Sequence, residues 1–120
     1  MIINPKLIGA KKLWENQNPS NTFESQTIIL KNDNYDTLKI FYLRTYGSGN
    51  QDNQMMSTEI IKGYNGLLHS NWSGTTNATQ MRMMTRNSDT SYTFSNAYQS
   101  GSVTNSIIIP MLIIGYKNGI

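Results

Sequence analysis

The sequence has 120 residues, a formal net charge of +3 and no cysteine, which predicts one domain over residues 1–120 and excludes disulfides and thiolate metal sites. Its lysines and arginines are scattered, whereas phosphate binding needs a clustered basic face, so we expect no nucleic-acid partner. Asn, Ser, Thr and Gln make up 45 of the 120 residues, beside 10% aromatic residues, which indicates a folded domain with a neutral polar surface.

The first strand patterns are separated by a turn-rich segment. Residues 25–31 ("SQTIILK") are rich in β-branched side chains and lead into "NDNYD" at 32–36. This cluster is oxygen-rich, as calcium loops are, but it lacks the glycine and the downstream glutamate of an EF-hand, so we interpret it as a turn. Residues 37–46 then place Leu38, Ile40 and Tyr42 on one face of a strand. The opposite face is also partly apolar, which predicts a central strand between layers.

Residues 55–64 and 66–72 ("MMSTEIIKGY" and "GLLHSNW") have the pattern of two strands joined as a hairpin through "YNG". A short helix over 55–62 is the alternative, because Met56, Ile60 and Ile61 also have helical spacing. Residues 77–87 ("NATQMRMMTRN") alternate, and we expect the face that carries Arg82 and Arg86 to point to solvent.

The strand rhythm continues to the end of the chain. "SDTSYTFSNAY" (88–98) alternates with Tyr92 and Phe94 on one face, and the turn-rich "QSGSVTN" separates it from a final apolar run. About eight short strands with turn signals between them, and no helix of three turns, predict an all-β fold. We expect an antiparallel β-sandwich of jelly-roll-like type.

The final run, "SIIIPMLIIGYK" at 106–117, is too short for the roughly 18 apolar residues of a membrane span, so we expect no membrane segment. Pro110 disfavours a helix, and within a sheet it is confined to an edge, a bulge or a strand start. Both faces of the resulting strand are apolar. We expect Ile107, Ile109, Met111 and Ile113 to enter the core. The opposite set would contact a neighbouring subunit: Ile108, Pro110, Leu112 and Ile114. On this interpretation, Ile108→Asp or Leu112→Asp dissociates the assembly without unfolding the protomer.

Residues that carry enzymatic chemistry are sparse. His69 is the only histidine, and neither a metal-ligand cluster nor a G-x-S-x-G motif accompanies it. We therefore interpret His69 as a strand residue or a polar residue at a hairpin edge. Most of the seven carboxylates stand in turn sequences, where they cap backbone groups. The sequence thus predicts no enzyme, no metal site and no cofactor.

Aromatic residues beside polar loops suggest a different activity. Trp72 lies in "HSNWSGTTN", among small polar residues. A ring of this kind can stack on a sugar while neighbouring amides bind its hydroxyls, although Trp72 can equally fold back over the edge of the core. The candidate ligand-binding residues are Trp72, Asn71, Tyr46, Tyr64 and Tyr98.

Two blocks of the sequence together resemble a known family. The first, "LWENQNPSNTFESQTIIL" (13–30), has a Trp–Asn–Pro opening and the pattern F-x-x-Q-T-I-x-L. The second, "SYTFSNAYQSGSVTNSIIIPMLIIGYK" (91–117), ends in I-P-x-x-I-x-G-x-K. They are similar to the C-terminal or tip domains of tail-fibre and minor structural proteins of phages and prophages of Gram-positive gut bacteria. The match covers these two blocks, and between them only the strand rhythm agrees.

The resemblance implies a non-enzymatic virion protein: a tail-fibre tip or receptor-binding domain that contacts host cell-surface glycans and forms a homotrimer. It also implies a place on the phage particle, extracellular once mature, after synthesis in the bacterial cytoplasm. Two other functions fit the sequence, a free carbohydrate-binding module of β-sandwich type and a capsid-decoration protein. Assembly separates the first from the fibre tip, because a free module is typically a monomer.

Overall fold

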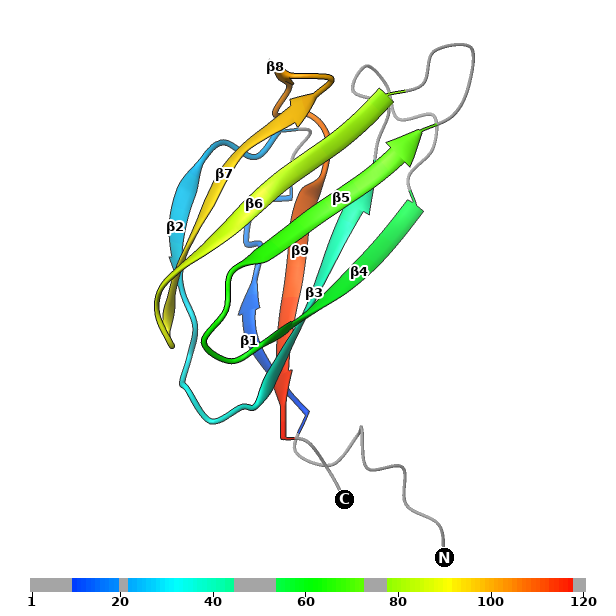
Figure 1. Cartoon of the computed structure of the whole chain (residues 1–120). Helices are drawn as coiled ribbons and strands as arrows, with labels where there is room; N and C mark the ends of the chain where they lie inside the picture. The colour runs from blue at the N-terminus through cyan, green and yellow to red at the C-terminus, as the bar shows by residue number, and fades with distance from the viewer. Residues whose placement is uncertain (1–9, 20–21, 45–53, 73–77, 118–120) are drawn as a thin grey trace, which may run out of the picture.

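Two antiparallel sheets pack face to face in the computed structural model of the chain (Figure 1). The structure describes residues 10–19, 22–44, 54–72 and 78–117, and for residues 71, 72 and 78 it describes the backbone alone. Within these residues every regular element is a strand. The all-β, sandwich-like fold expected from the sequence is therefore confirmed.

Each sheet is formed by strands from distant parts of the chain. Sheet A has the order β1 (Lys11–Glu15), β9 (Ile109–Tyr116), β3 (Thr37–Arg44), β4 (Gln54–Ile61). Sheet B has the order β2 (Gln26–Ile29), β7 (Ser91–Gln99), β6 (Ala78–Ser88), β5 (Gly66–Trp72), and the short β8 (Ser102–Val103) pairs with the end of β7. The first two strands pair with late strands, β1 with β9 and β2 with β7. The ends of the chain are thereby nested, as in a jelly roll.

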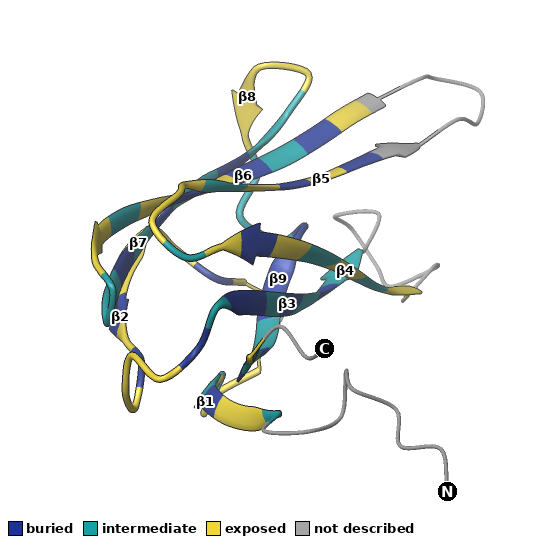
Figure 2. Ribbon diagram, turned by 60° about the horizontal axis from the view of Figure 1, so that its bottom comes forward, coloured by how far each residue is buried: buried dark blue, intermediate teal, exposed yellow. Residues whose placement is uncertain are grey.

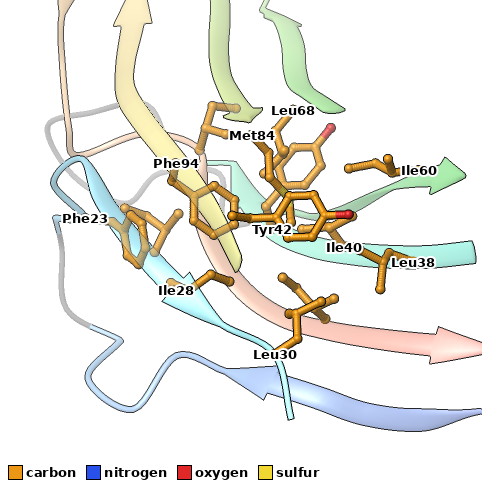
Figure 3. Close-up of a cluster of buried hydrophobic side chains, with 14 of the residues drawn as sticks. Phe23, Ile28, Leu30, Leu38, Ile40, Tyr42, Ile60, Leu68, Met84 and Phe94 are labelled. Atoms are coloured by element: carbon orange, nitrogen blue, oxygen red, sulfur yellow. The ribbon is translucent and has the colours of Figure 1, made fainter. Parts of the chain in front are cut away.

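The core lies between the sheets and follows the period-2 alternation of the strands (Figures 2 and 3). Leu38, Ile40 and Tyr42 of β3 are buried, as expected, and they face Leu68 and Met84 of sheet B within one cluster. The residues that alternate with them on β3 are half-buried, because no third layer covers the outer face of sheet A in the described part of the chain. The central position predicted for β3 is confirmed, since β9 and β4 flank it, but the layer expected over its second face is not found among the described residues.

The link between β4 and β5 differs from the expected hairpin. The chain does turn there, with Gly63 at a φ of 96°, but β4 pairs with β3 in sheet A and β5 pairs with β6 in sheet B. The hairpin prediction is therefore wrong, and so is the alternative helix. Where the connection crosses between the sheets, Gly66 packs closely against the Ile60 side chain. A Cβ at position 66 would lie only 2.0 Å from Cδ1 of Ile60, so any other residue there would force that side chain to shift.

Strand β6 also has its faces reversed relative to the sequence-based expectation. Arg82 has 0% of its surface exposed, and its neighbours on the same face, Gln80 and Met84, are buried too. The prediction that this face meets solvent is wrong for them, whereas Met83 on the other face is exposed. Arg82 is buried because it bonds backbone carbonyls from other parts of the chain, which the sequence of β6 alone does not reveal.

The guanidinium of Arg82 donates hydrogen bonds to three backbone carbonyls. Its Nε donates to the Ile108 carbonyl at 2.8 Å, and its Nη2 donates to the Ile107 carbonyl at 3.3 Å. Nη1 donates to the Ser95 carbonyl at 2.7 Å, and the Phe23 ring stands 5.1 Å from the guanidinium carbon. A buried charge is tolerated when it is hydrogen-bonded, and here each of the three guanidinium nitrogens has a carbonyl acceptor.

The acceptors are presented by two backbone irregularities. Residues Ser95 and Asn96 of β7 lie opposite Met83 of β6 alone, which forms a β-bulge. Ile108 has a φ of 49°, a left-handed conformation that is rare for a β-branched residue. The bulge and the Ile108 conformation together bring three carbonyl oxygens to the Arg82 guanidinium. Arg82 thus stabilises a segment that would otherwise bury unpaired backbone groups.

The final apolar run is a strand with an irregular start. Pro110 is the second residue of β9, and the pairing with β3 shifts between Phe41 and Tyr42, which leaves Met111 as a bulge. Both a strand start and a bulge were among the positions expected for Pro110. The expected division into two faces is wrong at this end, because Ile108 and Pro110 are buried within the chain itself together with their neighbours. These two residues therefore have no surface to offer a partner.

The two sequence blocks that carry the family resemblance lie side by side. Trp14 of β1 contacts Phe23 and Phe94, with ring centroids 6.2 and 5.9 Å away, and Phe23 meets Phe94 edge-on at 5.5 Å. The backbone N–H of Phe23 donates to the Asn105 carbonyl at 2.9 Å. Both blocks therefore contribute to one end of the core.

Candidate binding surface

The outer face of sheet B carries a row of in-register side chains that crosses all of its later strands. His69 of β5 pairs with Met81 of β6, Met81 pairs with Tyr98 of β7, and Tyr98 pairs with Val103 of β8. His69 and Val103 are exposed, and Met81 and Tyr98 are half-buried. We call these four residues the outer row. Tyr98 thus lies between two apolar neighbours, Met81 and Val103, and His69 lies beyond Met81.

The neighbouring positions extend the outer row. Leu67 and Met83 are a directly opposed pair on β5 and β6, on the same face, and both are exposed. Strand alternation places them there, because Leu68 and Met84 face the core. The resulting surface is apolar along β5 and β6, and it is bordered by exposed Thr79 and Thr85.

A tight turn fixes one end of the outer row. Ser100 and Gly101 both have positive φ, 51° and 90°, between the paired residues Gln99 and Ser102. This is the two-residue type I′ hairpin, whose twist matches that of its strands. The turn-rich "QSGSVTN" segment is thus confirmed as a turn, and it holds Val103 beside Tyr98.

The structure brings only part of the predicted ligand-binding set together. The backbones of Asn71 and Trp72 lie at the end of β5, paired with Thr79 and Ala78, near the end of sheet B that carries Tyr98. Tyr64 is 66% exposed but lies in the turn between β4 and β5, at the opposite end of the sheet (Figure 1). Tyr46 lies outside the described residues.

Sequence reasoning missed most of the outer row. It found Tyr98 because that residue precedes a polar loop, and it interpreted His69 as a polar strand residue, which the structure confirms. The alternation over residues 77–87 places Met81 and Met83 on the face opposite Arg82, but the Arg82 face was the one expected outside. Once Arg82 is known to be buried, alternation alone places both methionines on the surface.

Charged groups form separate pairs. Arg86 contacts Asp89 at 2.8 Å, Lys12 contacts Glu15 at 2.8 Å, and Lys117 approaches Asp36 at 3.9 Å. Within the described ranges, no three His, Cys, Asp or Glu residues come together as metal ligands would. The "NDNYD" segment is a turn, as expected, since the Asn32 side chain accepts a hydrogen bond from the Asn34 backbone at 2.9 Å.

Tyrosine hydroxyls have shifted pKa values for physical reasons. Burial, then the hydrogen bond to Glu59 and the charge of that carboxylate, raise the pKa of Tyr116 to about 12. Burial likewise raises the pKa of Tyr42, whose hydroxyl donates to the His69 carbonyl at 2.9 Å. These groups hold their protons more tightly in the folded chain than in the unfolded one.

We expect a pH-dependent loss of stability that involves Tyr116. Its pKa in the folded chain, about 12, lies above the ordinary value of 10, so its contribution is complete below pH 10 and is lost as the pH rises through 12. Between these values the free energy of unfolding should fall more steeply in the wild type than in Tyr116→Phe, as measured by urea titrations at each pH. Parallel pH profiles for the two proteins would contradict the assignment.

Comparisons with known proteins identify no relative of the chain. No protein-family model, no curated protein and no solved structure matches the chain. Among the described residues no helix is long and apolar enough to cross a membrane.

Proposed function

We propose that this protein is a non-enzymatic structural component of a phage particle, a tail-fibre tip or receptor-binding domain that contacts host cell-surface glycans. The observation that carries the proposal is the packing of the two sequence blocks on which the family resemblance rests. β1 pairs with β9, β2 pairs with β7, and the Trp14, Phe23 and Phe94 rings contact one another. The residues that carry the resemblance thus form one connected structural unit.

Asparagine side chains in these blocks fix the loops between strands. Asn105 accepts a hydrogen bond from the Ala97 backbone at 2.8 Å and donates to the Asn96 side chain at 2.9 Å. The Asn96 side chain also accepts from the Ser25 backbone at 3.2 Å. These contacts give Asn96 and Asn105 a structural role in holding the loops. The same uncharged amides suit a surface that meets glycans outside a cell.

The outer row is the site that we assign to glycan contact. Tyr98 supplies the stacking ring, half-buried between Met81 and Val103, which limits its motion. Exposed Thr79, two residues before Met81 on the same face of β6, supplies a hydroxyl at the border of this surface. A ring that is already held in place loses little conformational entropy when a sugar binds.

A glycan array tests this assignment. Tyr98→Ala should weaken binding by about tenfold or more, the loss expected when a central aromatic contact is truncated. Tyr64→Ala is the control, because Tyr64 is a more exposed tyrosine that lies at the other end of sheet B. Equal losses in both variants, or no glycan bound by the wild type, would contradict glycan contact by the outer row.

Of the four residues expected to contact a neighbouring subunit, only Leu112 and Ile114 lie at the surface of the protomer. Leu112 and Ile114 of β9 are half-buried on the outer face of sheet A, opposite Phe41 and Lys39 of β3. A trimer formed through this face stays a prediction of the resemblance. Fibre-tip domains commonly form trimers, whereas a free carbohydrate-binding module would be a monomer.

A further inference from the structure

Strand β4 is a long edge strand without the features that usually protect such edges. It has eight residues, contains neither proline nor glycine, and pairs with β3 without any register shift. Among the described residues no strand pairs with its other side (Figure 1). Of the other edges, β1 has a bulge and two lysines, β2 and β8 are short, and β5 is the other long edge strand but begins with a glycine. An unprotected edge is a template for pairing with another strand.

The one charged residue on β4 does not block this edge. Glu59 lies opposite Lys39 of β3, and its carboxylate accepts a hydrogen bond from the hydroxyl of Tyr116 on β9, beyond β3. The side chain therefore turns toward the middle of sheet A. Edge protection by charge requires a side chain that an incoming strand would meet, and Glu59 does not meet that requirement.

The pairing with β3 fixes which backbone groups of β4 face outward. The N–H of Lys62 donates to the Asp36 carbonyl at 2.9 Å, so Lys62 directs its backbone groups toward β3. In an antiparallel pair this direction alternates along the strand. Met55, Ser57, Glu59 and Ile61 therefore direct their N–H and C=O groups away from β3.

The polarity of β4 is symmetric about Thr58. Three residues to either side stand Met55 and Ile61, which are 54% and 63% exposed. Met56 and Ile60 are the next pair inward, and Ser57 and Glu59 flank the centre. The sequence "QMMSTEIIK" at 54–62 thus shows the same pattern of polar and apolar residues in both directions. β5, the other long edge strand, has no such symmetry.

We propose that β4 pairs with β4 of a second copy of this chain, antiparallel, about a two-fold axis at Thr58. In this register Met55 lies opposite the partner's Ile61, and Ser57 lies opposite the partner's Glu59. These are the residues whose backbone groups face outward, so each pair exchanges hydrogen bonds. A self-complementary surface of this kind is what a two-fold dimer requires. The pairing joins sheet A of both copies, and it does not rest on the proposed function.

A single engineered cysteine tests the register, because the chain has no cysteine of its own. The two Thr58 residues form a non-hydrogen-bonded pair with their Cα atoms about 4.5 Å apart, within the range that disulfides span. Thr58→Cys should therefore form a covalent dimer on oxidation, seen on a non-reducing gel. Met55→Cys is the control, because it is more exposed but lies about 20 Å from its symmetry mate.

Two double variants test the side-chain pairing in solution. Met55→Lys with Ile61→Glu places opposite charges against each other across the proposed axis, whereas Met55→Lys with Ile61→Lys places like charges there. Both remove the same exposed apolar groups, and both positions are on the surface of the protomer, so folding should be retained in both. We expect the dimer dissociation constant of the Lys–Glu variant, measured by sedimentation, to be at least about tenfold lower than that of the Lys–Lys variant.

The outcomes separate the edge pairing from other assemblies. A wild-type dimer that is cross-linked through Thr58→Cys, and not through Met55→Cys, supports the pairing. A monomer at every concentration tested, or equal cross-linking at both positions, overturns it. A trimer without a cross-link at position 58 also overturns it and instead supports the contact expected from the family resemblance. Glycan binding by the outer row is measured separately and can fail or succeed on its own.

Discussion

Replacing Arg82 with leucine is expected to lower the free energy of unfolding by about 3–5 kcal/mol, as measured by urea denaturation. The leucine would leave the carbonyls of Ile107, Ile108 and Ser95 without their donor in a buried site. Replacing both members of a buried ion pair with apolar residues can be harmless, because no polar group is left behind. Here the acceptors belong to the backbone and stay in every variant.

Arg82→Lys separates the charge of this residue from its hydrogen-bond geometry. Lysine keeps the positive charge but is a point donor, and it cannot reach three diverging carbonyls as a planar guanidinium does. We expect an intermediate loss of stability. Near-wild-type stability for Arg82→Lys would contradict the hydrogen-bonding explanation.

Arg86→Leu is the matched control for Arg82→Leu. Arg86 lies on the same strand, but a third of its side chain is exposed, and its ion pair with Asp89 is of the surface type. Such pairs contribute about 0–1 kcal/mol. Equal losses at the two arginines would show that charge removal in general, rather than the buried carbonyl contacts, destabilises the protein.

The pH range of this effect follows from the pKa of Arg82. Burial lowers that pKa to about 10, so the guanidinium remains charged at neutral pH. The folded-state pKa is depressed below the ordinary 12.5, so the penalty of burying the charge is relieved only as the pH rises above about 10. The destabilisation by Arg82→Leu should therefore be the same at pH 6 and at pH 8.

The sequence was sufficient to predict the local elements of the fold. Alternation on β3 predicted which of its residues are buried, and turn chemistry predicted the segment after β7. These features depend on neighbours in the chain, since side chains alternate along any strand and Gly permits positive φ. The sandwich architecture followed from the number and spacing of these elements.

The missed features depend on residues far apart in the chain. Alternation divides β6 into two faces but does not say which is buried, and an arginine favours the outside. What decides the matter is the set of carbonyls at Ile107, Ile108 and Ser95 that Arg82 meets. The outer row was missed for the same reason, because Met81 reaches the surface only when Arg82 is buried. Likewise, the turn before Gly66 was visible, but the pairing of β4 with β3 was not.

Replacing Ile108 with aspartate is expected to unfold the protomer, which is the opposite of the result expected from the sequence alone. Ile108 has 0% of its surface exposed and belongs to the core cluster. A carboxylate there would be buried beside Arg82, whose guanidinium already bonds the backbone carbonyls of this segment. The cost is several kcal/mol, of the order of the total stability of a small domain. Circular dichroism at room temperature measures this loss directly.

Ile114→Asp is the informative comparison, because it makes a similar change on the same strand at the outer face of sheet A. Ile114 is half-buried and lies between Lys12 of β1 and Lys39 of β3. An aspartate at this position gains two opposite charges as cross-strand neighbours, so the expected loss is about 1–2 kcal/mol. The strand signal should be retained. If Ile114→Asp unfolds the chain as Ile108→Asp does, the outer face of sheet A is part of the folding core. If it stays folded and lowers the solution mass, this half of β9 is the contact between subunits, and the apolar run serves the core at one end and assembly at the other.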